Sequence, residues 1–168
     1  GETTLTELAP TRDHTERMLQ SFGVELEMSE RSISIQGGQI LKSPGMVEVP
    51  GDISHAAFLL GAAALADGGR ASILGVGLNP GRIGFLDVLE RMGASVRREF
   101  LRSDPEPVGN VHLEAGRLRG VRIDPTEVPG LIDELPVIAA LALAAEGETR
   151  VEGAGELRFK ETDRILAL

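Results

Sequence analysis

The chain contains no cysteine, tryptophan or tyrosine, and its only aromatic side chains are those of five phenylalanines. Without cysteine, these residues can form no disulfide, no thiolate metal site and no cysteine nucleophile. The same absence is compatible with a reducing cytosol, and we predict a cytoplasmic protein. Surfaces that bind nucleic acids usually combine a basic patch with stacking aromatic side chains, for which this composition offers little material.

Positive charge is also scarce. Lys and Arg number 17 against 26 Asp and Glu, which gives a net charge of −9. We therefore predict no nucleic-acid partner, because such partners select basic surfaces. The longest apolar run, residues 56–66, has about half the length needed to span a bilayer, so we also predict no membrane association. An anionic ligand would have to be bound by a few well-placed bases and by backbone N–H groups.

Signals for metals and nucleotides are weak. The three histidines, His14, His55 and His112, lack the spacing of a metal site, and we predict no metal and no organic cofactor. The stretch GVGLNPGR at residues 75–82 has glycines after a predicted strand. It nevertheless matches neither the dinucleotide-binding nor the P-loop pattern.

Hydrophobic periodicity predicts an α/β chain. Strands are predicted at residues 24–29, 32–37, 46–50, 70–77, 95–101, 110–116, 118–124 and 149–155. Helices are predicted at residues 11–22, 54–67, 79–92, 131–147 and 156–168, with Thr11 and Asp52 as N-caps. The helices at 54–67 and 131–147 are rich in alanine and apolar on nearly all sides, which is typical of buried helices.

An internal repeat follows from the order of these elements. Residues 62–77 align without gaps on residues 140–155, 78 positions later, and the glycines at 75 and 77 fall on glycines at 153 and 155. A shift of 70 positions places Arg12 on Arg82. Arg12, Arg82 and Lys160 then occupy equivalent positions, each a base at the start of the second helix of a β-α-β-α-β-β unit.

The densest cluster of charge is KETDR at residues 160–164. In the predicted helix, Lys160 and Arg164 are four residues apart and share one face, about 6 Å apart at Cβ. One interpretation is a solvated helix surface of mixed charge. The other is a clamp for phosphate and carboxylate groups, with Glu161 beside it as an acid or base, since helix N-termini attract anions.

A second candidate lies in LIDELP at residues 131–136, where Asp133 and Glu134 interrupt an apolar stretch. A carboxylate at this position can simply favour the helix N-terminus. It can also serve as a general base at the mouth of a buried helix. The repeat aligns His55 with Asp133, and for His55 a structural role is the simpler interpretation.

These segments together resemble one family. LIDELPVIAALALAAEG followed by ELRFKETDR is similar to the signature of the 5-enolpyruvylshikimate-3-phosphate synthases, the 3-phosphoshikimate 1-carboxyvinyltransferases. The segments TRDHTERML, VPGDISHAAF and GLNPGRIGFLDVLERMGA resemble further family segments in the same order. The resemblance covers essentially the whole chain, which we interpret as the middle part of an enzyme more than twice as long.

The resemblance implies a fold and a reaction. The fold is the α/β enolpyruvyl transferase fold, built from β-α-β-α-β-β repeats with buried helices and outer mixed sheets. Residues 1–48 would complete a first domain, and residues 49–168 would form part of a second, with one full unit and the start of the next. The reaction is transfer of enolpyruvyl from phosphoenolpyruvate to the 5-hydroxyl of shikimate 3-phosphate, in the shikimate pathway to aromatic amino acids.

The resemblance also implies roles for six residues, carried over position by position. Asp133 would be the base on the 5-hydroxyl, and Glu161 the acid that protonates the phosphoenolpyruvate methylene. Lys160, Arg12 and Thr11 would bind shikimate 3-phosphate, and Arg164 would bind phosphoenolpyruvate. His55, Gly81 and Ile83 depart from the residues usual in the family, and we expect none of them to touch an assigned role.

Several predictions depend on segments of the family that lie outside these residues. We expect the 168-residue chain alone to be inactive and to need the remaining segments of the same enzyme. The nearest alternative is a UDP-N-acetylglucosamine enolpyruvyl transferase, which shares the fold and the enolpyruvyl donor. A non-catalytic, anion-binding module of the same fold is the alternative from another class. An RNA-end enzyme of similar repeat architecture fits the acidic composition less well.

Overall fold

The computed structural model describes residues 1–9 and 11–168. Its strands are β1 (Glu2–Thr6), β2 (Leu26–Met28), β3 (Ser32–Gln36), β4 (Arg70–Gly77), β5 (Ser95–Arg102), β6 (Val108–Glu114), β7 (Arg122–Ile123) and β8 (Arg150–Val151). Its α-helices are α1 (His14–Ser21), α2 (Ile53–Leu65), α3 (Gly84–Met92), α4 (Leu135–Ala144) and α5 (Arg164–Ala167). Short 3-10 turns occupy Val128–Gly130, Ile132–Glu134 and Gly155–Phe159.

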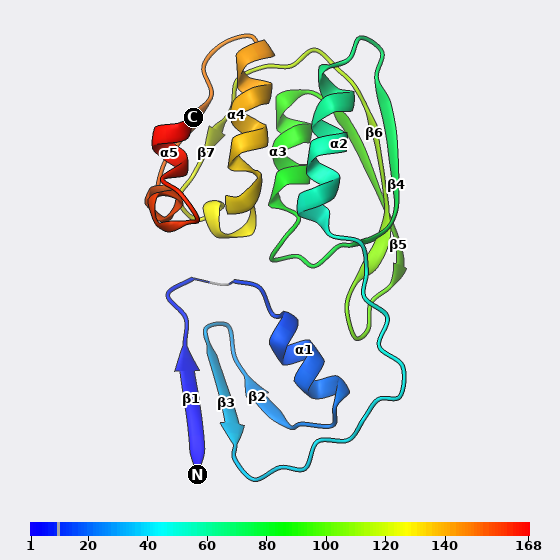
Figure 1. Cartoon of the computed structure of the whole chain (residues 1–168), viewed down its shortest axis with the longest axis vertical. Helices are drawn as coiled ribbons and strands as arrows, with labels where there is room; N and C mark the ends of the chain where they lie inside the picture. Colours follow the sequence, from blue (N-terminus) through cyan, green and yellow to red (C-terminus); the bar gives the residue numbers. More distant parts are fainter. Residues whose placement is uncertain (10) are drawn as a thin grey trace.

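Two three-stranded antiparallel sheets have the same topology. The first has the order β1-β3-β2 and the second the order β4-β6-β5, and a helix follows the first strand in each. A connection without helix or strand, which includes residues 41–50, leads from β3 to α2, and α2 is followed by β4 of the second sheet (Figure 1). Parallel pairing also occurs, between β7 and β8 and in two isolated bridges, from Gly51 to Val76 of β4 and from Arg119 to Glu146. The equivalent sheets support the repeat predicted from the sequence.

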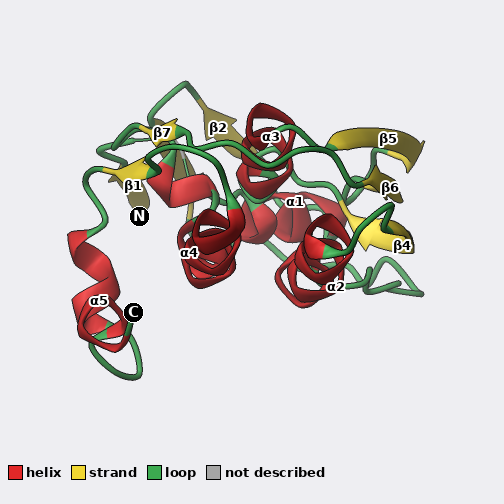
Figure 2. Cartoon of the chain, turned by 90° about the horizontal axis from the view of Figure 1, so that it is seen from above, coloured by secondary structure: helices red, strands yellow, loops and turns green. Residues whose placement is uncertain are grey.

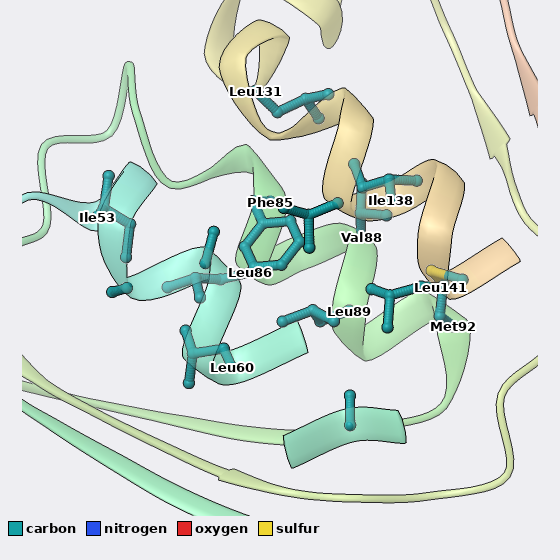
Figure 3. Packing of buried hydrophobic residues seen from close by; sticks show 14 of the residues in the cluster. Ile53, Leu60, Phe85, Leu86, Val88, Leu89, Met92, Leu131, Ile138 and Leu141 are labelled. Carbon is teal, nitrogen blue, oxygen red and sulfur yellow. The ribbon is translucent and has the colours of Figure 1, made fainter. Parts of the chain in front are cut away.

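The hydrophobic core lies among α2, α3 and α4, beside the β4-β6-β5 sheet (Figures 1 and 2). Helix α2 starts where the Asp52 carboxylate accepts a hydrogen bond from the Ser54 backbone N–H at 2.9 Å, as predicted for an N-cap. Helix α3 buries Phe85, Leu86 and Leu89 against its neighbours (Figure 3). Gly93 ends α3 with a φ of 112°, a conformation that favours glycine.

Burial is uneven across the chain. In residues 1–9 and 11–48, the only fully buried hydrophobic side chain is Val24, and α1 has no buried residue. One face of the apolar helices is exposed as well, since Phe58 and Leu59 of α2 and Leu143 of α4 are 64%, 63% and 92% accessible. Apolar packing therefore fixes residues 53–157 far more firmly than it fixes the first sheet.

Several predicted elements are wrong or shorter than predicted. Residues 46–50 form no strand, because they pair with no neighbouring strand and leave Met46 and Val49 exposed. The strands predicted at 118–124 and 149–155 shrink to β7 and β8. Helix α1 starts at His14 rather than after Thr11, α3 starts at Gly84 rather than near residue 79, and the helix predicted at 156–168 is a 3-10 turn followed by α5.

Two adjacent leucines of α2 test where the core lies. Leu60 is fully buried, whereas Leu59 is 63% exposed. We expect Leu60→Ala to lower the free energy of unfolding of the 168-residue chain by about 2–5 kcal/mol, because it leaves a cavity among α2, α3 and α4. The matched control Leu59→Ala should cost less than about 1 kcal/mol. Urea unfolding followed by circular dichroism measures both, and equal losses would contradict this core.

Candidate active site

Asp133 lies in the 3-10 turn that leads into α4, and three bases converge on it. The Arg12 guanidinium donates a hydrogen bond to Oδ2 at 2.7 Å. The Lys160 Nζ and an Arg164 guanidinium nitrogen lie 3.4 and 3.6 Å from Oδ1. The carboxylate is 25% accessible, so it is partly shielded from water but open to a ligand. Residues separated by 121 positions in the sequence thus form one charged cluster.

The KETDR segment is not the continuous helix that the sequence predicted, although its bases do reach this cluster. Lys160 follows the 3-10 turn in an extended conformation, and Arg164 is the first residue of α5. The two side chains therefore do not share a helical face, and they meet because each contacts Asp133. Figure 1 shows α5 and the preceding turn next to the start of α4, above the loop that follows β1.

The two acids of KETDR differ in their partners. Glu161 Oε2 accepts hydrogen bonds from Arg164 at 2.7 and 3.1 Å, and its side chain is 74% accessible. Asp163 accepts the Leu166 N–H at 3.0 Å as the N-cap of α5, and it pairs with Arg158 at 2.8 Å. Asp163 is therefore a structural carboxylate, whereas Glu161 remains accessible next to the cluster.

Arg12 and Thr11 approach from the loop before α1. The Thr11 hydroxyl donates to Glu7 Oε1 at 2.5 Å instead of capping the helix. Both residues border a hollow of about 210 Å³, lined by Thr11, Arg12, Pro129, Ile132, Glu156 and Lys160. A larger hollow of about 470 Å³ also touches Arg12 but is lined by six carboxylate side chains. The smaller hollow is the better place for an anion, because two of its residues are bases.

Opposing effects set the pKa of Asp133. Burial alone would raise it, but the hydrogen bond from Arg12 and the charge of Lys160 outweigh burial and hold the pKa below the ordinary value of 3.8. Asp133 is therefore ionised at neutral pH. Three cations face Asp133 and Glu161, so the cluster carries one positive charge in excess and favours an anionic ligand.

Glu134, the next residue, is buried to 1% accessibility and contributes a polar link beneath the site. It accepts a hydrogen bond from the Ser54 hydroxyl, and that hydroxyl in turn accepts one from Arg82 at 2.5 Å. Burial, reinforced by the charge of Asp133, raises the pKa of Glu134. The interruption of an apolar stretch by an acid was the sequence signal for this residue, but its partners on α2 and before α3 were not predicted.

Two positions outside the cluster need comment. His55 is 88% accessible and lies 3.9 Å from Asp52, so its alignment with Asp133 does not place it in the site. Gly81 contacts two predicted site residues, since a Cβ there would lie 2.7 Å from the Thr11 carbonyl oxygen and 3.2 Å from the Arg12 Cα. Gly81 therefore lies directly against the backbone of two predicted site residues, although it has no assigned role itself.

The described residues offer neither a metal cluster nor a membrane-spanning helix. Residues 1–9 and 11–168 contain no group of three or more His, Cys, Asp or Glu side chains placed to hold a metal ion. None of the helices in that part of the chain has the length and apolarity needed to cross a bilayer.

The pairing of Asp133 predicts a pH dependence of stability. Because its pKa is lowered on folding, Asp133 stabilises the fold above the ordinary Asp pKa, and this contribution is lost as pH falls through the lower folded value. We expect Asp133→Asn to be less stable than the parent chain at neutral pH. The difference should shrink between about pH 4 and pH 2. Urea unfolding across this range tests it, with the exposed Asp67→Asn as control, and a constant difference would contradict the prediction.

Glu134 predicts a pH dependence of stability opposite to that of Asp133. Its pKa is raised on folding, so the folded chain loses stability as pH rises from the ordinary Glu pKa of 4.5 through the raised value. Glu134→Gln keeps an acceptor for Ser54 but cannot ionise. We expect this variant to gain in melting temperature relative to the parent as pH rises from about 4 to 7. A difference that does not change with pH would show that Glu134 does not resist ionisation.

Comparison with known proteins places this chain in a family. The model of EPSP synthase (3-phosphoshikimate 1-carboxyvinyltransferase) matches residues 1–168. The 3-phosphoshikimate 1-carboxyvinyltransferase of Bacillus licheniformis is 49% identical over 166 residues, which is 98% of this chain and 39% of that protein. The enzyme of the same name from Bacillus subtilis is 48% identical over the same shares, and that of Pelotomaculum thermopropionicum is 47% identical over 169 residues.

A solved structure agrees with the sequence match. The EPSP synthase of Acinetobacter baumannii superposes with a TM-score of 0.89 at 42% identity, over 99% of this chain and 38% of that one. The predicted enolpyruvyl transferase fold is thereby confirmed. The chain spans about 39% of the length of the relatives that it matches. On sequence and structure together, the chain belongs to the EPSP synthase family.

Proposed function

We propose that this chain is the middle part of a 3-phosphoshikimate 1-carboxyvinyltransferase. The whole enzyme would transfer the enolpyruvyl group of phosphoenolpyruvate to the 5-hydroxyl of shikimate 3-phosphate and release phosphate. The observation that carries this proposal is the convergence of Arg12, Lys160 and Arg164 on Asp133. Two anionic substrates and a proton transfer require such a set of bases around a carboxylate.

Each group has a role in the proposed addition step. Asp133 accepts the proton of the 5-hydroxyl of shikimate 3-phosphate while the oxygen of that hydroxyl attacks C2 of phosphoenolpyruvate. In the structure a backbone hydrogen bond and Arg164 lower the pKa of Glu161. We propose that Glu161 takes up a proton from solvent once phosphoenolpyruvate has replaced it as the partner of Arg164. It then donates this proton to the methylene carbon, which becomes a methyl group in the tetrahedral intermediate. Elimination then removes a proton from that methyl group and expels phosphate. No electron acceptor is needed, because the C–O bond formed to the 5-oxygen replaces the C–O bond broken to phosphate, and otherwise only protons are transferred.

The position of Arg164 supports this division of labour. Its guanidinium contacts Asp133 at 3.6 Å and Glu161 at 2.7 Å, so it lies between the proposed base and the proposed acid. An anion bound to Arg164 is thereby placed between two proton-transfer groups. We assign phosphoenolpyruvate to Arg164, and shikimate 3-phosphate to Lys160, Arg12 and Thr11, which border the 210 Å³ hollow.

Substrate binding would also change Asp133. Its low pKa depends on hydrogen bonds and charges from Arg12 and Lys160. When the substrate anions take these bases as partners, Asp133 loses part of that stabilisation and its pKa rises, which makes it a better base. We propose that the same ion pairs hold Asp133 in place before the reaction and release it when both substrates are bound.

The remaining proposals concern the surroundings of the site. We propose that a boundary near residue 48 divides the chain into the end of one domain and part of another, in accord with the two separate sheets. We further propose a cytoplasmic enzyme whose partners are its two substrates and the other segments of its own chain. The 168-residue chain alone is expected to release no phosphate.

The test measures phosphate release by the full-length enzyme, that is, by a chain as long as those of its relatives. With phosphoenolpyruvate and shikimate 3-phosphate we expect turnover, and with UDP-N-acetylglucosamine as acceptor none. Asp133→Asn should lower kcat by about 10²- to 10⁴-fold, because it removes the general base. The control Asp67→Asn, an exposed carboxylate after α2, should leave kcat within about twofold.

The other outcomes separate the alternatives. Turnover only with UDP-N-acetylglucosamine would keep the fold and the chemistry but overturn the acceptor. Absence of turnover with either acceptor would indicate a non-catalytic, anion-binding member of the fold. Full activity of Asp133→Asn would remove Asp133 from the reaction.

A further inference from the structure

Asn79 is 2% accessible, one of two buried polar side chains among the described residues, and it lies in the loop between β4 and α3. Its amide nitrogen donates to Asp13 Oδ1 at 2.6 Å and to Glu106 Oε1 at 2.9 Å. Its amide oxygen accepts the Gly81 N–H at 2.9 Å. Both amide hydrogens and the carbonyl therefore have partners, which is what a buried amide requires.

The contact with Asp13 matters because Asp13 follows Arg12 directly. The second Asp13 oxygen accepts a hydrogen bond from Arg17 at 2.9 Å, so both oxygens of this carboxylate are fixed. Burial alone would raise the pKa of Asp13, but the hydrogen bonds from Arg17 and Asn79 outweigh it and lower the pKa. Asp13 therefore accepts the Asn79 hydrogen bond as a carboxylate, which makes that bond a strong one.

Gly81 holds the same segment from a second side. A Cβ at Gly81 would lie 2.7 Å from the Thr11 carbonyl oxygen and 3.2 Å from the Arg12 Cα. Its φ is not in the left-handed region, so glycine is needed here for close approach rather than for backbone conformation. The Thr11–Asp13 backbone thus rests directly on residues 79–81.

Among the described residues, apolar packing contributes little to holding this segment. Helix α1 contributes no buried side chain, so apolar packing does not hold it against the second sheet. Helix α1 makes two polar contacts with the loop between β5 and β6. These are a hydrogen bond between His14 and Glu106 at 3.0 Å and a long one from Arg17 to the Pro105 carbonyl at 3.5 Å. We propose that Asn79 and Gly81 form a dock for Thr11–Asp13, and that this dock positions Arg12 against Asp133.

In the reaction the dock would act through Arg12. This part of the inference rests on the proposed function, in which Arg12 binds shikimate 3-phosphate. Asn79 and Gly81 are positioning residues, because neither lines the hollow beside Lys160. Loosening the dock should therefore weaken the binding of shikimate 3-phosphate more than it slows the chemical step.

The effect of the dock on how the first sheet is held relative to the second can be measured without an activity assay. The chain has no cysteine, so Glu27→Cys on β2 and Ser95→Cys on β5 give two unique, exposed sites for spin labels. Electron–electron distance measurement on the 168-residue chain should show one narrow distribution. Asn79→Asp, which opposes a carboxylate to Asp13 and Glu106, and Gly81→Ala, which removes the close approach, should each broaden it.

Matched controls exist for both variants. Asn110 also donates to a carboxylate, Glu99 at 3.0 Å, and accepts a backbone N–H, that of Gly75 at 3.1 Å, but it lies within the second sheet. A Cβ at Gly155 would meet nothing within 4 Å. Asn110→Asp and Gly155→Ala should leave the distance distribution as it is in the parent. Distributions that stay narrow in Asn79→Asp and Gly81→Ala would overturn the dock.

Kinetics of the full-length enzyme then test whether the dock acts through Arg12. Asn79→Asp should raise the KM for shikimate 3-phosphate about 10-fold or more and change kcat less. In an Arg12→Ala background, Asn79→Asp should add almost nothing, because both changes remove one interaction. Additive effects would refute positioning through Arg12. An enzyme inactive with shikimate 3-phosphate would refute the proposed function, while the distance measurement would still decide on the dock.

Discussion

Apolar burial on both sides of Asp133 is the constraint on which the site depends. Leu131, Ile132, Leu135 and Ile138 are between 1% and 5% accessible, and they anchor the 3-10 turn and the first turn of α4 in the core. The carboxylate between them cannot move far without opening that core, which is costly in a close-packed interior. Asp133 is thus the fixed point, and the three bases reach it from less tightly packed segments.

Charge balance explains why those bases gather around it. Arg12, Lys160 and Arg164 would repel one another if they stood together alone, and Asp133 and Glu161 supply the opposite charges. These pairs are partly exposed and individually weak, so an incoming phosphate or carboxylate can replace them at small cost. A cluster held by buried, fully satisfied pairs would be more rigid but would resist that exchange. Partial exposure therefore suits the proposed site, in which substrate anions would take the place of Asp133 as partners of these bases.

Regular patterns made the core predictable from the sequence. The alternation in residues 70–77 predicted β4 at its observed bounds, and the apolar stretch at 54–67 predicted α2 to within two residues, because burial selects those side chains directly. KETDR was harder, since its bases meet through contacts with Asp133 rather than through helical spacing. Family resemblance named the candidate site residues, but neither it nor local patterns predicted that Asn79 and Gly81 contact the segment that carries Arg12.

Arg12 and Arg82 occupy equivalent positions in the repeat but make different contacts. Arg12 and Arg82 each stand two residues before the helix that follows the first strand of a sheet. Arg82 is 17% accessible and donates to Asp52 and to Ser54, whose hydroxyl in turn binds the buried Glu134. Those contacts tie the start of α2 to the turn that carries Asp133.

Arg12 instead crosses from the first sheet to Asp133 itself and borders the hollow beside Lys160. Arg82 thus stabilises the turn from below, while Arg12 contacts Asp133 directly. The second role requires a loop free of the core, and so a separate means of holding that loop in place.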